Sequence, residues 1–340
     1  MNLSKEQCNH IKGLGILLIM LHNYVDILLG IGSNEVRFSQ EAVDIFQAHV
    51  FTADFLWYIL SYAGWIGVPV FFFLSGYGLT KKYPDTQHLA PGPYIKNHLI
   101  KLWLLLIPVY LVYYAIYRTN IKSAIAQITF TNTILSYGKN GIYIDPGVYW
   151  FFGAILQFYL LFLVFRKLSN RWLWMLGGGF VVFHYFILYG VSPETMNWTR
   201  NNFLGWGEIF ILGILAARSG FSVSKRLNAV ACAVSLVALC VCLVTKWLTP
   251  LVELFTVVFF ITLTGMVRLK WVGFIGIISS SVFVIHPLVR MLFYSIYFAP
   301  EHPYITTLIY AAIVLVVSWI HYRVLKWFNK MVFSRRYNNS

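Results

Sequence analysis

Apolar runs of about twenty residues recur from one end of this 340-residue chain to the other. A helix needs roughly 20 apolar residues to cross a hydrocarbon core of about 30 Å. Only 11% of the residues are charged, against about 25% in a soluble domain, so the chain lacks the polar side chains to cover a water-facing surface. The sequence therefore predicts an all-α integral membrane protein, folded as a single domain over residues 1–340.

The apolar runs predict a bundle of about ten transmembrane helices. Their expected ranges are 13–31, 63–80, 99–117, 149–165, 172–190, 203–217, 227–245, 251–267, 273–297 and 304–325. The segment 43–61 is apolar but carries acidic residues, and the segment 122–136 is short and polar. Both are expected to lie at the membrane interface or to re-enter the membrane.

The basic residues predict the orientation. With an even number of spans, one orientation places most of the 26 Lys and Arg residues on the side of both termini, in short clusters between apolar runs. Positive charge collects on the cytoplasmic side of membrane proteins, so the N- and C-termini are both expected in the cytoplasm. The lipid bilayer accounts for the net charge of +14 in this arrangement, and no nucleic-acid partner is expected.

Ionisable side chains within the spans mark candidate functional positions, because each costs about 2.5–3.5 kcal/mol on insertion scales. His22 and Asp26 share one face of the first helix, so the carboxylate is expected to orient the imidazole. His286 and Arg290 are spaced in the same way in the ninth helix, and both histidines are expected near mid-membrane. Histidine suits proton transfer because its pKa of about 6.5 lies near working pH. The simpler interpretation of each histidine is a hydrogen bond that joins two helices.

Two carboxylates and a third histidine are less clearly placed. Glu208 and Glu253 lie toward the outer ends of the sixth and eighth helices, where they are expected to pair with Arg290. His184, between two aromatic residues, is interpreted as a packing residue. No histidine or cysteine cluster has the spacing of metal ligands, so no bound metal is expected.

Aromatic residues gather in the second outer loop and at the start of the next helix. They are Tyr137, Tyr143, Tyr149 and Trp150. Aromatic rings near a membrane surface usually anchor the protein at the interface. The alternative is a platform on which a sugar ring stacks, with Trp150 as a contact.

Six motifs follow one another along nearly the whole chain. They are IKGLGILLIMLHNY at 11–24, GWIGVPVFFFLSGYGLT at 64–80, YIKNHLIKLWLLLIPVY at 94–110, YWFFGAILQFYLLF at 149–162, FILGILAAR at 210–218 and FIGIISSSVFVIHPL at 274–288. Together and in this order they resemble the membrane acyltransferase family 3, bacterial proteins that acylate sugars and other cell-envelope acceptors. Each motif alone could occur in many hydrophobic helices, so the order carries the resemblance.

The resemblance implies acyl transfer from cytoplasmic acyl-CoA, expected to be acetyl-CoA, to a hydroxyl of a cell-envelope saccharide or a lipid-linked sugar. His22 would be the general base, contributing about 10²–10⁴-fold. Acetyl-CoA would be a co-substrate, and no bound cofactor is expected. The expected location is the bacterial inner membrane, because outer-membrane proteins are β-barrels.

The same motifs supply candidate binding residues. Lys12 is expected to bind donor phosphates or to position the thioester. Ser75 and Gly76 fit the second motif, either as substrate contacts or as small residues in a helix interface. The other candidates for substrate and donor binding are Lys96, Lys101, Trp150, Gln157, Tyr159, Glu208 and Arg290.

The first helix departs from the usual pattern of the family it resembles. That pattern places the histidine eleven positions after the basic residue, whereas His22 follows Lys12 by ten and Asn23 is the eleventh. At about 100° per residue, eleven positions leave two side chains about 20° apart and ten leave them about 80° apart. The sequence leaves open which residue occupies the catalytic position, and His22 is preferred because an amide is a poor proton acceptor. Lys12 also replaces the more usual arginine, and Ile155 and Leu156 stand where many members carry acidic residues.

A transporter or flippase for an envelope saccharide or a lipid-linked intermediate is the alternative function. Ten helices with intramembrane charges would suit a moving bundle. However, the sequence has no inverted repeat and no paired broken helices, which are the usual indicators of a transporter. A purely structural scaffold would leave the mid-membrane histidines unexplained. The sequence does not indicate an oligomeric state.

Overall fold

The computed structural model describes residues 2–29, 38–118, 120–136, 147, 149–220, 224–297 and 303–334. Helices make up 85% of the described residues, which contain no strand. The prediction of an all-α protein is therefore confirmed. Tyr137 and Tyr143 of the predicted aromatic loop lie outside the described residues.

The helices fall into three length classes. The longest are α1 (Lys5–Leu29), α5 (Pro91–Tyr117), α9 (Asn170–Gly190), α12 (Lys225–Val244) and α16 (Pro303–Ser334). Those of intermediate length are α4 (Pro69–Lys82), α8 (Trp150–Phe165), α11 (Gly207–Ser219), α13 (Val252–Met266) and α15 (Ser279–Tyr297). The short ones are α2 (Gln40–Ala48), α3 (Phe55–Ala63), α6 (Ile121–Ile128), α7 (Asn132–Leu135), α10 (Pro193–Arg200) and α14 (Lys270–Ile277). Three 3₁₀ turns join them: η1 (Gly64–Gly67), η2 (Phe203–Gly205) and η3 (Lys246–Leu251).

Seven helical stretches within the described residues are long and apolar enough to cross a membrane. They are Lys5–Leu29, Phe55–Lys82, Pro91–Tyr117, Asn170–Gly190, Lys225–Val244, Lys246–Met266 and Pro303–Met331. The number rises to eight if α14 and α15, which meet at an angle of 77°, form one broken span. The 16 residues of α8 and the 13 of α11 fall short of the roughly 20 that a span needs. The protein is therefore a multi-pass membrane protein, and the prediction of ten spans is not confirmed.

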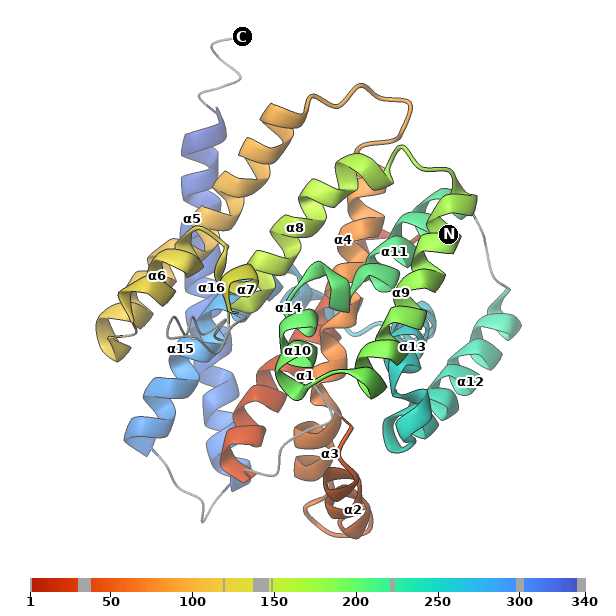
Figure 1. The fold of residues 1–340 in the computed structure, drawn as a ribbon. Coiled ribbons are helices and arrows are strands. Elements are labelled where there is room, and N and C mark those ends of the chain that lie inside the picture. Colours follow the sequence, from red (N-terminus) through yellow and green to blue (C-terminus); the bar gives the residue numbers. More distant parts are fainter. Residues whose placement is uncertain are drawn as a thin grey trace.

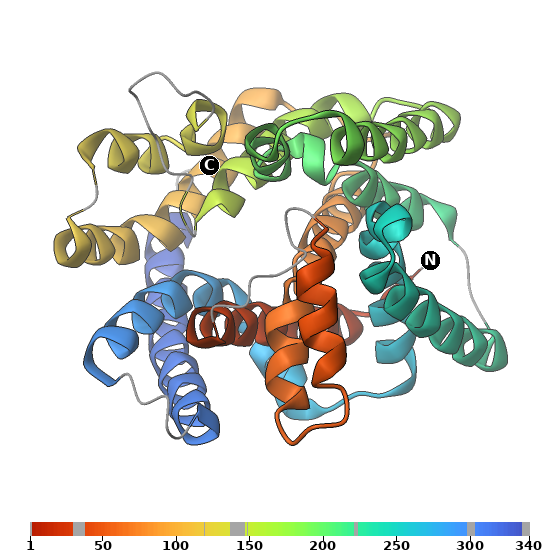
Figure 2. The ribbon, with the colours of Figure 1, turned by 60° about the horizontal axis from the view of Figure 1, so that its bottom comes forward.

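The two segments set apart in the sequence form short helices. The segment 43–61 covers parts of α2 and α3, which pack together and project from one end of the bundle (Figures 1 and 2). Through η1, α3 continues directly into α4. The segment 122–136 forms α6 and α7. At the opposite end of the bundle from α2, α4 ends and α5 begins (Figure 1).

Glycines allow the central helices to approach each other closely. A Cβ atom at Gly76 of α4 would overlap the Phe210 carbonyl of α11, and one at Gly213 of α11 would overlap the Phe73 carbonyl of α4. Helix α1 packs on α14 through glycines in the same way. Small residues serve this purpose in membrane helices because they bring two backbones into van der Waals contact. These contacts fix α1, α4 and α14 around the interior of the bundle.

Stacked aromatic rings fill the space between α4, α8 and α11. Phe72 stacks on Trp206 with 5.0 Å between ring centroids, and Phe158 stacks on Phe210 at 4.5 Å. Trp150, the first residue of α8, stacks on Trp206 with 5.8 Å between ring centroids. Such pairs add about 0.5–1.5 kcal/mol beyond the burial of their surface. The beginning of α8 is thereby fixed beside α4.

Candidate active site

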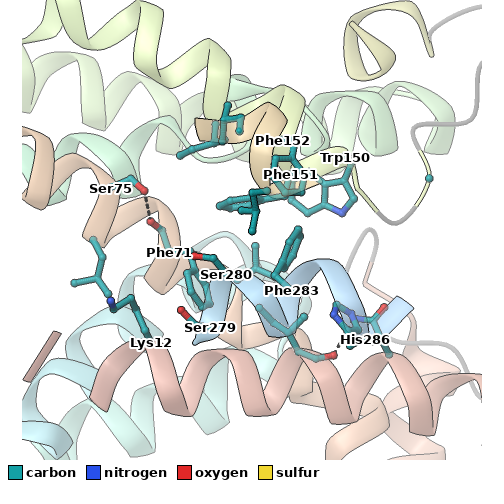
Figure 3. Close-up of a pocket in the computed structure, with 18 of the residues that line it drawn as sticks. Lys12, Phe71, Ser75, Trp150, Phe151, Phe152, Ser279, Ser280, Phe283 and His286 are labelled. Atoms are coloured by element: carbon teal, nitrogen blue, oxygen red, sulfur yellow. Dashed lines mark hydrogen bonds between the residues drawn. The ribbon is translucent and has the colours of Figure 1, made fainter. Parts of the chain in front are cut away.

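A cavity of about 450 Å³ lies inside the bundle, lined by α1, α4, α5, α8 and α15 (Figure 3). Lys12 and Asn23 line it from one face of α1. Ser279 and Ser280 line it at the break between α14 and α15, and His286 follows two turns further along α15. Figure 3 shows Lys12 and His286 toward opposite ends of the cavity, with the serines between them.

His286 presents one ring nitrogen to its own helix. Its Nδ1 atom lies 3.0 Å from the Val282 carbonyl oxygen, which can only accept, so Nδ1 carries the hydrogen. In the neutral imidazole the lone pair therefore resides on Nε2. His286 lines the cavity, and the hydrogen bond at its Nδ1 atom fixes the tautomer of the imidazole.

Asn23 joins α1 to α15 beside that histidine. A guanidinium nitrogen of Arg290 donates to the Asn23 carbonyl at 2.9 Å and to Asn23 Oδ1 at 3.2 Å. The Asn23 amide nitrogen donates in turn to the Ile19 carbonyl at 2.8 Å. Arg290 was predicted to contact substrate. In the structure it is largely buried and holds Asn23, the residue eleven positions after Lys12.

His22 lies on a different face of α1. It is buried against Gly64, outside the cavity lining, and its Nδ1 atom donates to the Leu60 carbonyl at 3.0 Å. Asp26 lies within electrostatic reach of His22 and accepts a hydrogen bond from Ser61 at 3.1 Å. The structure thus brings His22 and Asp26 together, as their spacing predicts, but turns them toward α3 and η1.

Lys12 is half-buried at the other end of the cavity. Its ammonium group makes no hydrogen bond or ion pair with another residue that the structure describes. An ammonium group in this position is available for an anionic or strongly polar ligand. Ser75 also lines the cavity, and its hydroxyl donates to the Phe71 carbonyl of its own helix at 2.7 Å. Gly76, by contrast, faces α11 and serves helix packing.

Trp150 and Tyr159 line the cavity from α8, and their role as substrate contacts stays a prediction. The Arg200 guanidinium lies 5.0 Å from the Trp150 ring centre, within the range of a cation–π contact, and Arg200 lines the cavity as well. Burial lowers the pKa of Arg200 to about 10, and the neighbouring Glu253 carboxylate counteracts this effect. Arg200 therefore remains a cation at neutral pH.

Gln157, also predicted to bind substrate, lies outside the cavity lining. Its amide nitrogen donates to Thr133 at 3.1 Å and to Asn202 at 2.9 Å, and its amide oxygen accepts from the Phe203 backbone N–H at 2.9 Å. These bonds satisfy the amide on three sides. Gln157 therefore holds α7 and η2 against α8.

A basic cleft of about 840 Å³ adjoins the cavity, and Lys82 and Tyr83, at the end of α4, line it. Lys82, Lys101 and Lys326 line the cleft from α4, α5 and α16. Leu105 and Ser280 line both the cleft and the cavity, so the two volumes meet there. Lys96, predicted to bind the donor, is exposed and lies outside the lining of both.

Glu208, which is buried, and Glu253, which is half-buried, form a cluster with His184 instead of pairing with Arg290. Glu208 Oε1 lies 3.6 Å from His184 Nδ1, and the ligand atoms of His184, Glu208 and Glu253 all lie within 4.8 Å of one another. The interpretation of His184 as simple packing is therefore incomplete. The three residues lie on α9, α11 and α13, so no local motif could have indicated their proximity.

The fold and the cavity define a class of protein: a helical membrane protein with an imidazole, an ammonium group and hydroxyls around one internal volume. A family model described as an acyltransferase domain matches residues 6–323, nearly the whole chain. The chain belongs to the membrane acyltransferase family 3, and the resemblance found in the motifs is confirmed. No curated protein and no solved structure matches it.

Proposed function

We propose that the protein transfers an acyl group, expected to be acetyl, from cytoplasmic acyl-CoA to a hydroxyl of a cell-envelope saccharide or a lipid-linked sugar. The observation that carries this proposal is the cavity itself. It holds His286 and Lys12 toward opposite ends, and it meets a basic cleft at Ser280. Membership of an acyltransferase family supports the reaction class.

The basic cleft suits the donor. Coenzyme A combines negatively charged phosphates with a long, uncharged arm that ends in the thioester. Lys82, Lys101 and Lys326 supply positive charge for the phosphates, since an ammonium group forms charge-assisted hydrogen bonds to phosphate oxygens. The arm would then pass Leu105 and Ser280 and carry the thioester into the cavity.

In the proposed reaction, His286 Nε2 removes the proton from the acceptor hydroxyl as its oxygen attacks the thioester carbonyl. The carbon–sulfur bond then breaks, and the imidazolium returns the proton to the thiolate of the departing coenzyme A. The N-terminus of α15, where Ser279 and Ser280 lie between Lys12 and His286, would stabilise the negative charge that develops on the carbonyl oxygen. Lys12, toward the other end of the cavity, would position the donor.

The structure favours His286 over His22 as the base. A general base must come within hydrogen-bond reach of the proton that it takes. His286 lines the cavity, whereas His22 is enclosed by α3 and η1. Asn23 stands at the position eleven residues after Lys12, and its amide is a poor proton acceptor. The prediction that His22 is the base is therefore the alternative to test.

The orientation follows from the same proposal. The cleft would face the cytoplasm of a bacterial inner membrane, where acyl-CoA is made, in agreement with the positive-inside rule. The acceptor would enter the cavity from the outer side or from the lipid. Labelled acceptor confined outside sealed vesicles would then be modified when acyl-CoA is supplied inside.

The direct test uses purified protein in detergent with radiolabelled acetyl-CoA and a panel of envelope saccharides and lipid-linked sugars. We expect label to appear on one acceptor class, with one free coenzyme A released for each group transferred. Binding of an envelope saccharide without any transfer of label, and without coenzyme A binding, would favour the carrier alternative.

A further inference from the structure

A second buried polar site lies behind the cavity wall. His184 of α9, Glu208 of α11 and Glu253 of α13 bring an imidazole and two carboxylates together, with their ligand atoms within 4.8 Å of one another. A pocket of about 90 Å³ adjoins the site, and His184, Arg200 and Glu253 line it. Arg200 lines this pocket on one side and the main cavity on the other.

The orientation of His184 turns a lone pair toward the carboxylates. Its Nε2 atom lies 2.9 Å from the Leu204 carbonyl oxygen, so Nε2 carries a hydrogen. In the neutral ring, Nδ1 is then the acceptor, and Nδ1 is the atom that faces Glu208. Histidines that bind metal ions are held in this way, with the second ring nitrogen donating to a carbonyl or a carboxylate.

Glu208 is buried without a donor. Its side chain is 9% exposed, and neither of its oxygens accepts a hydrogen bond from any residue that the structure describes. The same holds for Oε2 of Glu253. A buried carboxylate is costly unless hydrogen bonds or a cation compensate it, and Arg200 supplies part of that compensation for Glu253. Three electron-pair donors therefore converge here, one from the imidazole and one from each carboxyl group.

The distances fit a shared ion better than a direct hydrogen bond. The 3.6 Å between His184 Nδ1 and Glu208 Oε1 is too long for a hydrogen bond. Zinc binds histidine nitrogen and carboxylate oxygen at about 2.0–2.2 Å, which places two ligands of a tetrahedral ion about 3.4 Å apart. The ligand atoms all lie within 4.8 Å of one another, so side-chain shifts of up to about 1.4 Å would bring every pair to the same geometry.

We propose that His184, Glu208 and Glu253 bind one divalent first-row metal ion, with zinc as the expected occupant. One imidazole and two carboxylates are a ligand set that zinc accepts, and the fourth position would face the small pocket. The ion would join α9, α11 and α13, and it would fix the charge next to Arg200 at the cavity wall. This site stands apart from the proposed acyl-transfer chemistry.

The test measures metal on the 340-residue chain in detergent, purified through a tag without histidine and without chelator. We expect about one equivalent of zinc per chain by elemental mass spectrometry. After removal with a chelator, titration with zinc should restore one equivalent and raise the thermal unfolding temperature. Glu208→Gln and Glu253→Gln should each weaken zinc binding at least about tenfold. The matched control is Glu41→Gln, at an exposed glutamate of α2, which should leave zinc binding unchanged.

Two results would overturn the proposal. The first is wild-type protein that carries no metal as isolated and binds neither zinc nor manganese at millimolar concentration. This result would mean that protonation of the carboxyl groups, and not a metal ion, neutralises the cluster. The second is stoichiometric binding that Glu208→Gln, Glu253→Gln and His184→Asn all leave unchanged in correctly folded protein. The wild-type titration decides the question even if a variant fails to fold.

Discussion

The cavity and the His184 cluster are both polar sites within one helical bundle, but their side chains face in different directions. In the cavity, Lys12 and His286 face an open volume of about 450 Å³. In the cluster, His184, Glu208 and Glu253 face one another beside a pocket of about 90 Å³. The first arrangement suits the entry and departure of substrates. The second suits a small ligand held among fixed helices.

This difference teaches how polar residues in a membrane protein divide their roles. A residue that faces open volume is free to act on a ligand, so its replacement should change activity and leave folding intact. A residue whose polar atoms or surface are enclosed by neighbouring helices contributes to folding, so its replacement should change stability first. Neighbouring positions in the same motif can belong to opposite classes, as Ser75 and Gly76 show.

The largest expected effect is at His286. His286→Asn should lower kcat by at least about a hundredfold, the low end for the loss of a general base, because the amide can still donate to the Val282 carbonyl but accepts a proton poorly. The KM for acyl-CoA should change little. The measurement is the rate of acceptor-dependent coenzyme A release by purified protein.

The matched control is His22→Asn, which likewise preserves a donor toward the Leu60 carbonyl. We expect it to retain activity within about tenfold of wild type, well short of the loss that removal of a general base causes. If instead His22→Asn abolished release in folded protein while His286→Asn did not, the base would be His22 and the assignment from the cavity would be wrong.

The next largest effect is expected at Gly76, whose surface is enclosed by α11. Gly76→Ala should lower the free energy of unfolding by about 1–3 kcal/mol, because its Cβ atom overlaps the Phe210 carbonyl. Gly78→Ala, two residues along α4, meets open space and should leave the free energy of unfolding unchanged or slightly raised. Denaturant titration in detergent measures both variants. Equal stability of the two, with a selective loss of activity in Gly76→Ala, would make Gly76 a substrate contact.

The smallest effect is expected at the basic cleft. Lys101→Gln should raise the KM for acyl-CoA about two- to fivefold, since a partly exposed ion pair contributes about 0.2–1 kcal/mol, and the effect should shrink at high salt. Lys96→Gln, exposed outside the cleft, should leave KM unchanged. Steady-state kinetics at two salt concentrations measure both. A larger KM change in Lys96→Gln would move the donor site away from the cleft.

Much of the fold could be predicted because long apolar runs directly predict membrane helices. The number of spans could not, since α8 and α11 are short and the ninth predicted helix is broken between α14 and α15. Cavity residues such as Lys12 and His286 were found because they lie in local motifs. The helical angle also identified Asn23, eleven residues after Lys12, as the side chain on the same face of α1.

The cluster could not be predicted, because its proximity exists only in three dimensions. His184, Glu208 and Glu253 come from three helices, and no spacing in the sequence links them. Gln157 illustrates a second limit. Its place in a motif predicted a substrate contact, but its hydrogen bonds to Thr133, Asn202 and Phe203 are set by segments distant in the sequence.

The most direct test of the central claim asks whether the donor reaches the cavity through the junction at Ser280. The measurement is the rate of thiol alkylation of Ser280→Cys in protein whose four native cysteines have been replaced. The control is Thr86→Cys, exposed in the loop between α4 and α5. The account predicts that saturating coenzyme A slows alkylation at position 280 several-fold and leaves position 86 unaffected. Equal rates with and without coenzyme A at position 280, in protein that binds coenzyme A, would contradict it.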